Sequence, residues 1–183
     1  TRGAAREGRF ERYMQPWMAG EREASEGSGE GAGYPFVQSH GDVAWIGVAS
    51  AVATAPFDAT GRCGPAQLGR LRQVLKRLGA RKQTRVVLVH HPPVDGLSKP
   101  KHALLDRAAF AEVIAEAGAE LVLHGHEHVR SQAQLRGPNG PVPVHGVPSG
   151  TSALHSAGRE SAFSVYDMSA TGITQEIYIW NGN

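Results

Sequence analysis

Five histidines fall into two short clusters, and each cluster adjoins a run of aliphatic residues. His90 and His91 follow the run 86–89, and His124, His126 and His128 follow the run 121–123. Continuous Val, Ile and Leu runs are typical of buried parallel strands, and ligands bind outside the carboxyl ends of such strands. Neutral imidazole suits zinc, manganese, iron and nickel. The pattern therefore predicts that both clusters lie at one sheet edge as part of a metal site.

The alternative interpretation is structural, because a solitary buried histidine is more often a hydrogen-bonded core residue than a ligand. Two clusters at the ends of neighbouring strands are hard to obtain from packing alone, which favours the metal interpretation. Histidines separated by one residue, such as His126 and His128, can contact two ions that lie close together. Gly125 lacks a Cβ, and we expect it to make the sharp backbone turn that aims these rings.

Hydrophobic periodicity indicates the elements that position the clusters. Residues 67–78 and 106–117 repeat their apolar side chains at helical spacing, and Gly79 and Gly118 suit the left-handed position that ends a helix. The second helix joins the two predicted strands, and such crossovers are right-handed almost without exception. Both histidine clusters are therefore expected to leave the sheet at the same edge.

Shorter elements surround this crossover unit. We expect an amphipathic helix before Gly20, a flexible loop over residues 21–33, and a hairpin that turns at residues 40–42. After Val129 the helical pattern stops, and short apolar runs alternate with turn residues, which favours an antiparallel sheet. Those strands are expected over residues 132–136, 142–147, 163–168 and 173–180. Residues 1–183 are thus predicted to form one α/β domain, with a mixed sheet followed by antiparallel strands.

Composition narrows the class of protein. The 183 residues are 40% hydrophobic and 20% charged, which is ordinary for a globular domain. No apolar stretch approaches the roughly 20 residues that cross a bilayer, so no membrane span is expected. A net charge of +2 gives no argument for a nucleic-acid partner. The single cysteine, Cys63, excludes an intrachain disulfide, fits a reducing, cytoplasmic compartment and is expected to be a structural thiol.

The motif residues resemble the calcineurin-like metallophosphoesterases. The segments His90-x-Pro92 and Gly125-His126-x-His128, with a helix and a strand between them, are similar to the last two signature blocks of that family. From residue 36 onward the chain is similar to the second half of bacterial members of the cyclic-nucleotide-phosphodiesterase type. The resemblance implies a four-layer α/β/β/α sandwich, of which this chain would be the C-terminal part.

The resemblance also implies a reaction and roles for the histidines. Members of the family hold two metal ions, usually combinations of manganese, iron or zinc, and a hydroxide between the ions attacks phosphorus. Such ions lower the pKa of bound water, neutralise phosphate oxygens and orient an in-line displacement. By this resemblance His90 and His126 would bind one ion and His128 the other. His91 would be an alternative ligand or a catalytic group that faces the substrate.

Neighbouring residues are expected in other roles. His124 is expected to pack or to orient a ligand ring, since metal-bound histidines usually have a hydrogen-bonded outer partner. Glu127 is expected to point into solvent. His155, Arg159 and residues 99–102 lie on predicted loops and are candidates for contact with a substrate.

The first three signature blocks of the family are absent from this sequence. They are Asp-x-His, Gly-Asp-x-x-Asp, and Gly-Asn-His followed by Asp or Glu; Gly41-Asp42 begins the second block, but Trp45 replaces its second aspartate. Without a bridging carboxylate, neutral histidines leave two dications uncompensated. We therefore expect a two-ion site only in a full-length parent, and expect this chain alone to be nearly inactive and to bind at most one ion. Its exposed sheet edge should promote self-association.

The sequence therefore predicts a metal-dependent phosphodiesterase or phosphatase that acts on a small phosphoester. Two other classes remain open. One is a degenerate phosphoesterase-like domain that binds a ligand or a regulatory partner without turnover. The other is a structural zinc site, which is disfavoured because such sites use four closed ligands, often cysteines.

Overall fold

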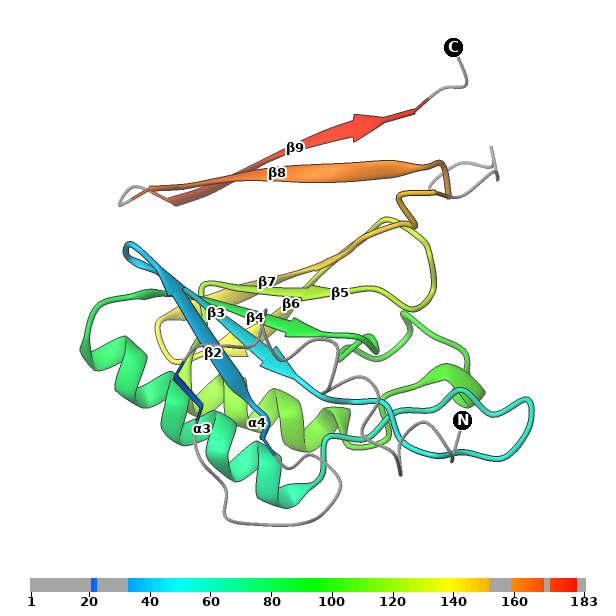
Figure 1. The fold of residues 1–183 in the computed structure, drawn as a ribbon, viewed down its shortest axis with the longest axis horizontal. Helices are drawn as coiled ribbons and strands as arrows, with labels where there is room; N and C mark the ends of the chain where they lie inside the picture. Colours follow the sequence, from blue (N-terminus) through cyan, green and yellow to red (C-terminus); the bar gives the residue numbers. More distant parts are fainter. Residues whose placement is uncertain (1–20, 23–32, 152–158, 170–171, 181–183) are drawn as a thin grey trace.

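Within the part of the chain that the structure describes, two helices cover one face of a mixed sheet, and a two-stranded hairpin lies over the opposite face (Figure 1). The computed structural model describes residues 21–22, 33–151, 159–169 and 172–180. The strands and helices in chain order are β1 (Glu21–Arg22), β2 (Phe36–His40), β3 (Val43–Val48), α3 (Pro65–Ala80), β4 (Thr84–Val89), the 3₁₀ turn η1 (Pro100–His102), α4 (Arg107–Ala117), β5 (Leu121–His124), β6 (Ser131–Gly137), β7 (Gly140–Gly146), β8 (Ala162–Ser169) and β9 (Gly172–Ile179).

Four parallel strands form the centre of the sheet, whose order is β1-β2-β3-β4-β5-β7-β6. The hairpin partners β2 and β6 run antiparallel to β3 and β7. The predicted crossover is confirmed, since β4 and β5 pair in parallel and α4 connects them. The predicted turn at residues 40–42 is confirmed as well, because His40 pairs with Val43 and Gly41 has a φ of 58°. Gly118, with a φ of 77°, ends α4 as expected.

The predicted end of the first helix is wrong, because α3 continues through Gly79. A Cβ at Gly79 would lie 2.7 Å from Nη1 of Arg85, so the glycine makes room for a guanidinium group. Arg85 is 8% exposed and donates from Nη1 to the carbonyl oxygens of Leu75 and Ala117, while its Nη2 pairs with Glu120 at 2.7 Å. Arg85 thus links both helices to β4, and its buried charge is fully paired.

The strands after residue 129 do not form one antiparallel sheet, contrary to that part of the prediction. The β6–β7 hairpin joins the mixed sheet through parallel pairing of β7 with β5, and only β8 and β9 form a separate sheet. Val142 and Val144 of β7 are buried in the core, which fixes that strand beside β5. The first two residues of the predicted loop 21–33 pair with β2 as β1. The helix expected before Gly20 lies outside the described residues.

The apolar core lies between the sheet and the helices. Its members include Ile46, Leu71, Val74, Leu75, Leu78, Val87, Phe110, Val113, Ile114, Val122 and Val144. Complete burial of one such side chain contributes about 1.5–3 kcal/mol, so this core holds the strand ends in place. Cys63 also lies in it, and burial, followed by the nearby Asp106 carboxylate, raises the pKa of its thiol to about 12. Among the described helices, none has the length and apolar character of a membrane span.

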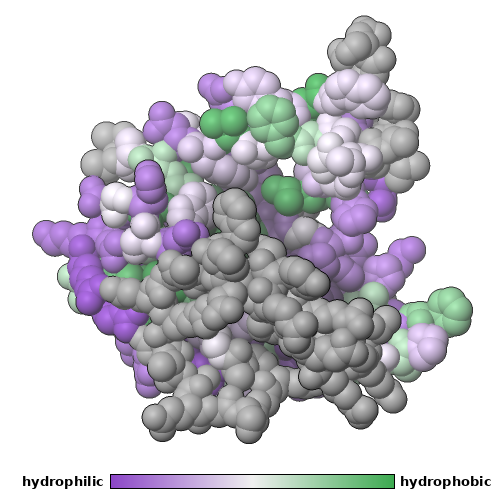
Figure 2. All heavy atoms as spheres, viewed as in Figure 1, coloured by the Kyte–Doolittle hydropathy of each residue, from purple (hydrophilic) through white to green (hydrophobic). Residues whose placement is uncertain are grey.

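The β8–β9 hairpin contacts the sheet through polar side chains. Tyr166 Oη lies 3.1 Å from Nδ1 of His145, and Gln175 Oε1 accepts a long hydrogen bond from Gln132. Its opposite face carries exposed apolar residues, of which Phe163 is 61% exposed. Figure 2 shows apolar atoms gathered on this hairpin at the top of the view. The described residues therefore leave the outer face of the β8–β9 hairpin uncovered.

Candidate metal centre

The two histidine clusters leave the sheet side by side. Val89 and His124 are paired across β4 and β5, so the residues that follow them emerge at the same level of the same edge. The Gly125 amide donates a hydrogen bond of 3.1 Å to the carbonyl oxygen of His90, which extends this pairing beyond the strands. Parallel pairing of two buried strands thus brings together clusters that are about 35 residues apart in sequence.

His90 and His126 point toward one another at this edge. Nε2 of His90 lies 3.0 Å from Nδ1 of His126, and their ring centroids are 4.9 Å apart in an edge-to-face arrangement. Ligands at right angles around an ion with bonds near 2.1 Å are about 3 Å apart. The two nitrogens can therefore share a proton or face a common ion. Of the residues predicted to bind metal, these two are brought together.

The backbone that carries His126 has a rare conformation. His126 and His128 have φ angles of 71° and 52°, in a backbone region that residues other than glycine seldom occupy. The Glu127 amide bonds to the Gly125 carbonyl oxygen at 2.9 Å, which closes a three-residue turn centred on His126. The sharp turn expected at Gly125 therefore falls on the histidines themselves. Such positions cost about 1–3 kcal/mol each and concentrate at functional sites.

His91 is enclosed by the loop between β3 and α3. Its side chain is buried, its Nδ1 accepts from Ser50 Oγ at 2.7 Å, and its Nε2 donates to the Ala59 carbonyl oxygen at 3.1 Å. Burial, followed by the neighbouring His126 and His90, lowers the pKa of His91 to about 4. The ring is therefore neutral near pH 7 with both nitrogens engaged. Its centroid lies 4.3 Å from that of His126, so it forms one wall of the site.

Gln67 and Ser50 support His91, although neither residue was predicted to belong to the site. Gln67 is 2% exposed, its Oε1 accepts from the Ala49 amide at 2.8 Å, and its Nε2 donates to the carbonyl oxygens of Ala49 and Cys63. These bonds fix the segment after β3, which presents Ser50 to His91. The available signal was a glutamine on the apolar stripe of a helix, where a polar side chain requires a partner.

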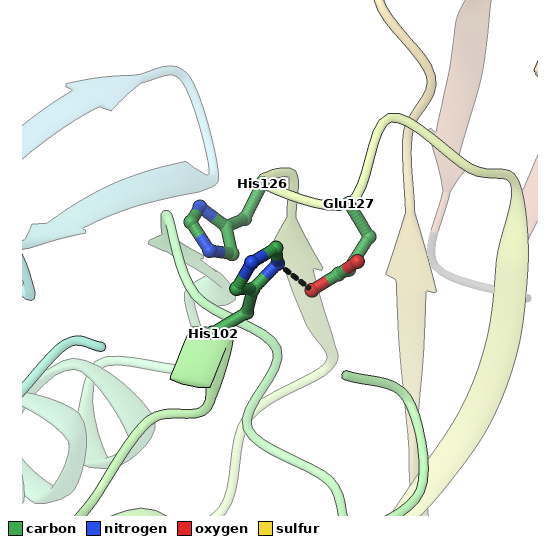
Figure 3. Close-up of side chains that lie close together, drawn as sticks. All are labelled: His102, His126 and Glu127. Atoms are coloured by element: carbon green, nitrogen blue, oxygen red, sulfur yellow. Dashed lines mark hydrogen bonds and ion pairs between the residues drawn. The ribbon is translucent and has the colours of Figure 1, made fainter. Parts of the chain in front are cut away.

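His102 and Glu127 also reach the cluster. Nδ1 of His102 lies 3.2 Å from Oε1 of Glu127, and the ring centroids of His102 and His126 are 5.4 Å apart. One donor atom from each of these three residues lies within 4.8 Å of the other two, as the close-up in Figure 3 illustrates. The expectation that Glu127 points into solvent is wrong, since its side chain is only 17% exposed.

The remaining predicted residues lie around this centre. His128 is exposed and has no hydrogen bond to another described residue. The pKa of His90 is lowered first by its own burial and second by the electrostatic effect of His128. His124 packs as expected, with Nδ1 near the Gly125 carbonyl oxygen and Nε2 near Ser131 Oγ. Arg159 donates to the Glu127 carbonyl oxygen at 3.3 Å. His155 lies outside the described residues.

Electrostatics favour neutral imidazoles at this edge. Burial is the leading cause that lowers the pKa values of His90, His91, His124 and His126, and repulsion by neighbouring histidines acts in the same direction. A metal ligand must be deprotonated, so these shifts reduce competition from protons. The arrangement is suited chemically to holding a divalent cation.

No known family model and no curated protein matches this chain.

Proposed function

We propose that this chain carries the histidine half of the metal site of a phosphoester hydrolase. The observation that most supports it is the 3.0 Å approach of the His90 and His126 ring nitrogens at adjacent strand ends. Packing does not require two imidazoles to meet there, since the apolar core lies on the helix side of the sheet. In this proposal the sheet and its helices are two layers of a four-layer α/β/β/α sandwich, and β8 and β9 belong to the third.

The chain's own residues would divide the work. His90 and His126 would hold one divalent ion, and His128 would contribute to a second. His91 would position the His126 ring by packing against it. It would not transfer a proton, because both of its ring nitrogens are engaged with Ser50 and Ala59. Bound manganese, iron or zinc would supply Lewis-acid stabilisation of phosphate oxygens. Arg159, beside Glu127, is a candidate for substrate contact.

Carboxylates set the limit of what the chain can do alone. The sequence contains none of the carboxylate blocks of the metallophosphoesterases that it resembles. Two dications held only by neutral imidazoles repel one another without compensation. The proposal therefore places the complete two-ion site in a full-length parent, and a binding domain without turnover is the competing function.

The test is hydrolysis of chromogenic phosphomonoesters and phosphodiesters by the full-length parent with Mn²⁺. His90→Ala and His126→Ala should each lower kcat/KM by at least about 100-fold, since even outer partners of metal ligands contribute 10–100-fold. His40→Ala is the matched control, because His40 is exposed at the β2–β3 turn, at the far ends of the strands. Full activity of His126→Ala would contradict the proposal, and a parent that binds metal without turnover would favour the binding domain.

A further inference from the structure

We propose that His102, His126 and Glu127 form a site for one divalent metal ion. This ligand set differs from the pair His90 and His126: His102 lies outside the signature segments described above, and Glu127 occupies the variable position between His126 and His128. The inference therefore goes beyond the proposed function, although both use His126.

The geometry of the three residues is close to that of a ligand set. Each offers a donor atom within 4.8 Å of the other two, and His102 Nδ1 and Glu127 Oε1 are already 3.2 Å apart. Donors around an ion with bonds of 2.0–2.2 Å are about 3.0–3.5 Å from one another. Small side-chain rotations are therefore enough to close the set. In Figure 3 the His126 and His102 rings lie side by side, with Glu127 next to His102.

His126 has one nitrogen left for an ion. Its Nδ1 is 3.0 Å from Nε2 of His90, whereas its Nε2 is buried and has no hydrogen-bond partner among the described residues. A histidine ligand usually donates its other N–H to an outer partner. His90 can accept that bond, which leaves the lone pair of His126 Nε2 for the metal. A buried acceptor without a partner is costly, and an ion would satisfy it.

The backbone around His102 is held on both sides. The carbonyl oxygens of Lys101 and Ala103 accept hydrogen bonds of 2.9 and 3.0 Å from the amides of Ala59 and Gly61. His102 thus lies on a segment tied to a second loop, opposite the strained turn that carries His126. A ligand set on fixed backbone loses less conformational freedom on binding, which favours affinity.

The donor types indicate the ion and the state of the site. Two imidazoles and one carboxylate suit zinc, and also manganese or iron, and three protein ligands leave a coordination position open. Glu127 would neutralise one of the two metal charges. The bound ion would keep a net positive charge, which suits an anionic ligand such as a phosphate ester.

The experiment is a calorimetric titration of the metal-free 183-residue chain with Zn²⁺, repeated with Co²⁺ by absorption spectroscopy. We expect one ion per chain, and His102→Ala and Glu127→Gln should each weaken binding by at least about 10-fold and change the Co²⁺ spectrum. His40→Ala should bind as the original chain does. Both test residues are at least partly accessible and outside the core, and circular dichroism checks that the variants fold.

Three other outcomes would overturn the inference. If His102→Ala and Glu127→Gln bind Zn²⁺ normally while His90→Ala does not, the ion belongs to His90 and His126, and the proposed function stands. If all three variants bind normally, neither ligand set holds the ion. If the original chain binds no ion, this site is absent, and hydrolysis by the parent still decides the proposed function independently.

Discussion

At the scale of single residues, two adjacent histidines have opposite environments. His90 is exposed and faces His126, whereas His91 is buried between Ser50 and Ala59. The sequence predicts that both histidines lie at the end of a strand. This is possible because the end of a strand can be recognised locally, from the point where a run of apolar residues stops. The local pattern does not show which of the two rings is buried, because the partners that enclose His91, Ser50 and Ala59, lie more than 30 residues earlier in the chain.

The burial of neutral His91 predicts a loss of stability in mild acid. Its pKa is lowered from 6.5 to about 4, so between these pH values the unfolded state binds more protons than the folded state. The free energy of unfolding should therefore be unaffected by this group above pH 6.5 and should fall as the pH drops toward 4. Urea unfolding at intervals between pH 7 and 4 measures it, and His91→Gln should reduce the slope. An NMR titration in which His91 protonates near pH 6 would contradict the prediction.

At the scale of elements, local repeats and long-range contacts differ in what they reveal. The crossover from β4 through α4 to β5 was predictable because helical and strand periodicities are written in neighbouring residues. The loop between β3 and α3 was not, because its bonds join it to distant segments, as when the Gly61 amide donates to Ala103. Nor was the room that Gly79 makes for Arg85, since Arg85 belongs to the next strand.

A close contact of that loop predicts a large effect from one methyl group. A Cβ at Gly61 would lie 2.2 Å from Nδ1 of His91, a ring held at both nitrogens, so Gly61→Ala should destabilise the protein by about 1–3 kcal/mol or more. Gly69→Ala is the matched control: Gly69 lies in α3 with nothing within 4 Å of its Cβ position. It should stabilise by about 0.5–1 kcal/mol. Equal urea midpoints for the two variants would show that the loop does not pack on His91.

At the scale of the whole molecule, the α/β class and the mixed sheet were predictable, whereas the division between sheets was not. Which sheet the β6–β7 hairpin joins depends on pairing with β5, and alternation along β7 does not specify a partner strand. The β8–β9 hairpin forms its own two-stranded sheet, and its outer face carries Phe163 and Tyr178, whose rings stack at 5.0 Å. A two-stranded sheet is marginally stable by itself and gains by pairing.

This exposed hairpin predicts that the isolated chain self-associates. Phe163, Val165 and Tyr178 are 61%, 48% and 48% exposed, and strand edges with apolar neighbours favour pairing between copies. Sedimentation velocity should show an average mass that rises above 19.5 kDa with concentration. Val165→Lys should shift the chain toward monomer, whereas Phe57→Lys, at a 95% exposed loop position away from the hairpin, should not. Purely monomeric sedimentation at high concentration would argue against association.

The burial of Cys63 makes the protein its own reporter of conformational opening. The thiol is 6% exposed and its pKa is about 12, so the reactive thiolate is almost absent near neutral pH while the core is closed. No other cysteine in the chain competes for an alkylating reagent. The rate at which iodoacetamide labels the native protein therefore measures local opening at the junction between the β3–α3 loop and α3, without any engineered probe.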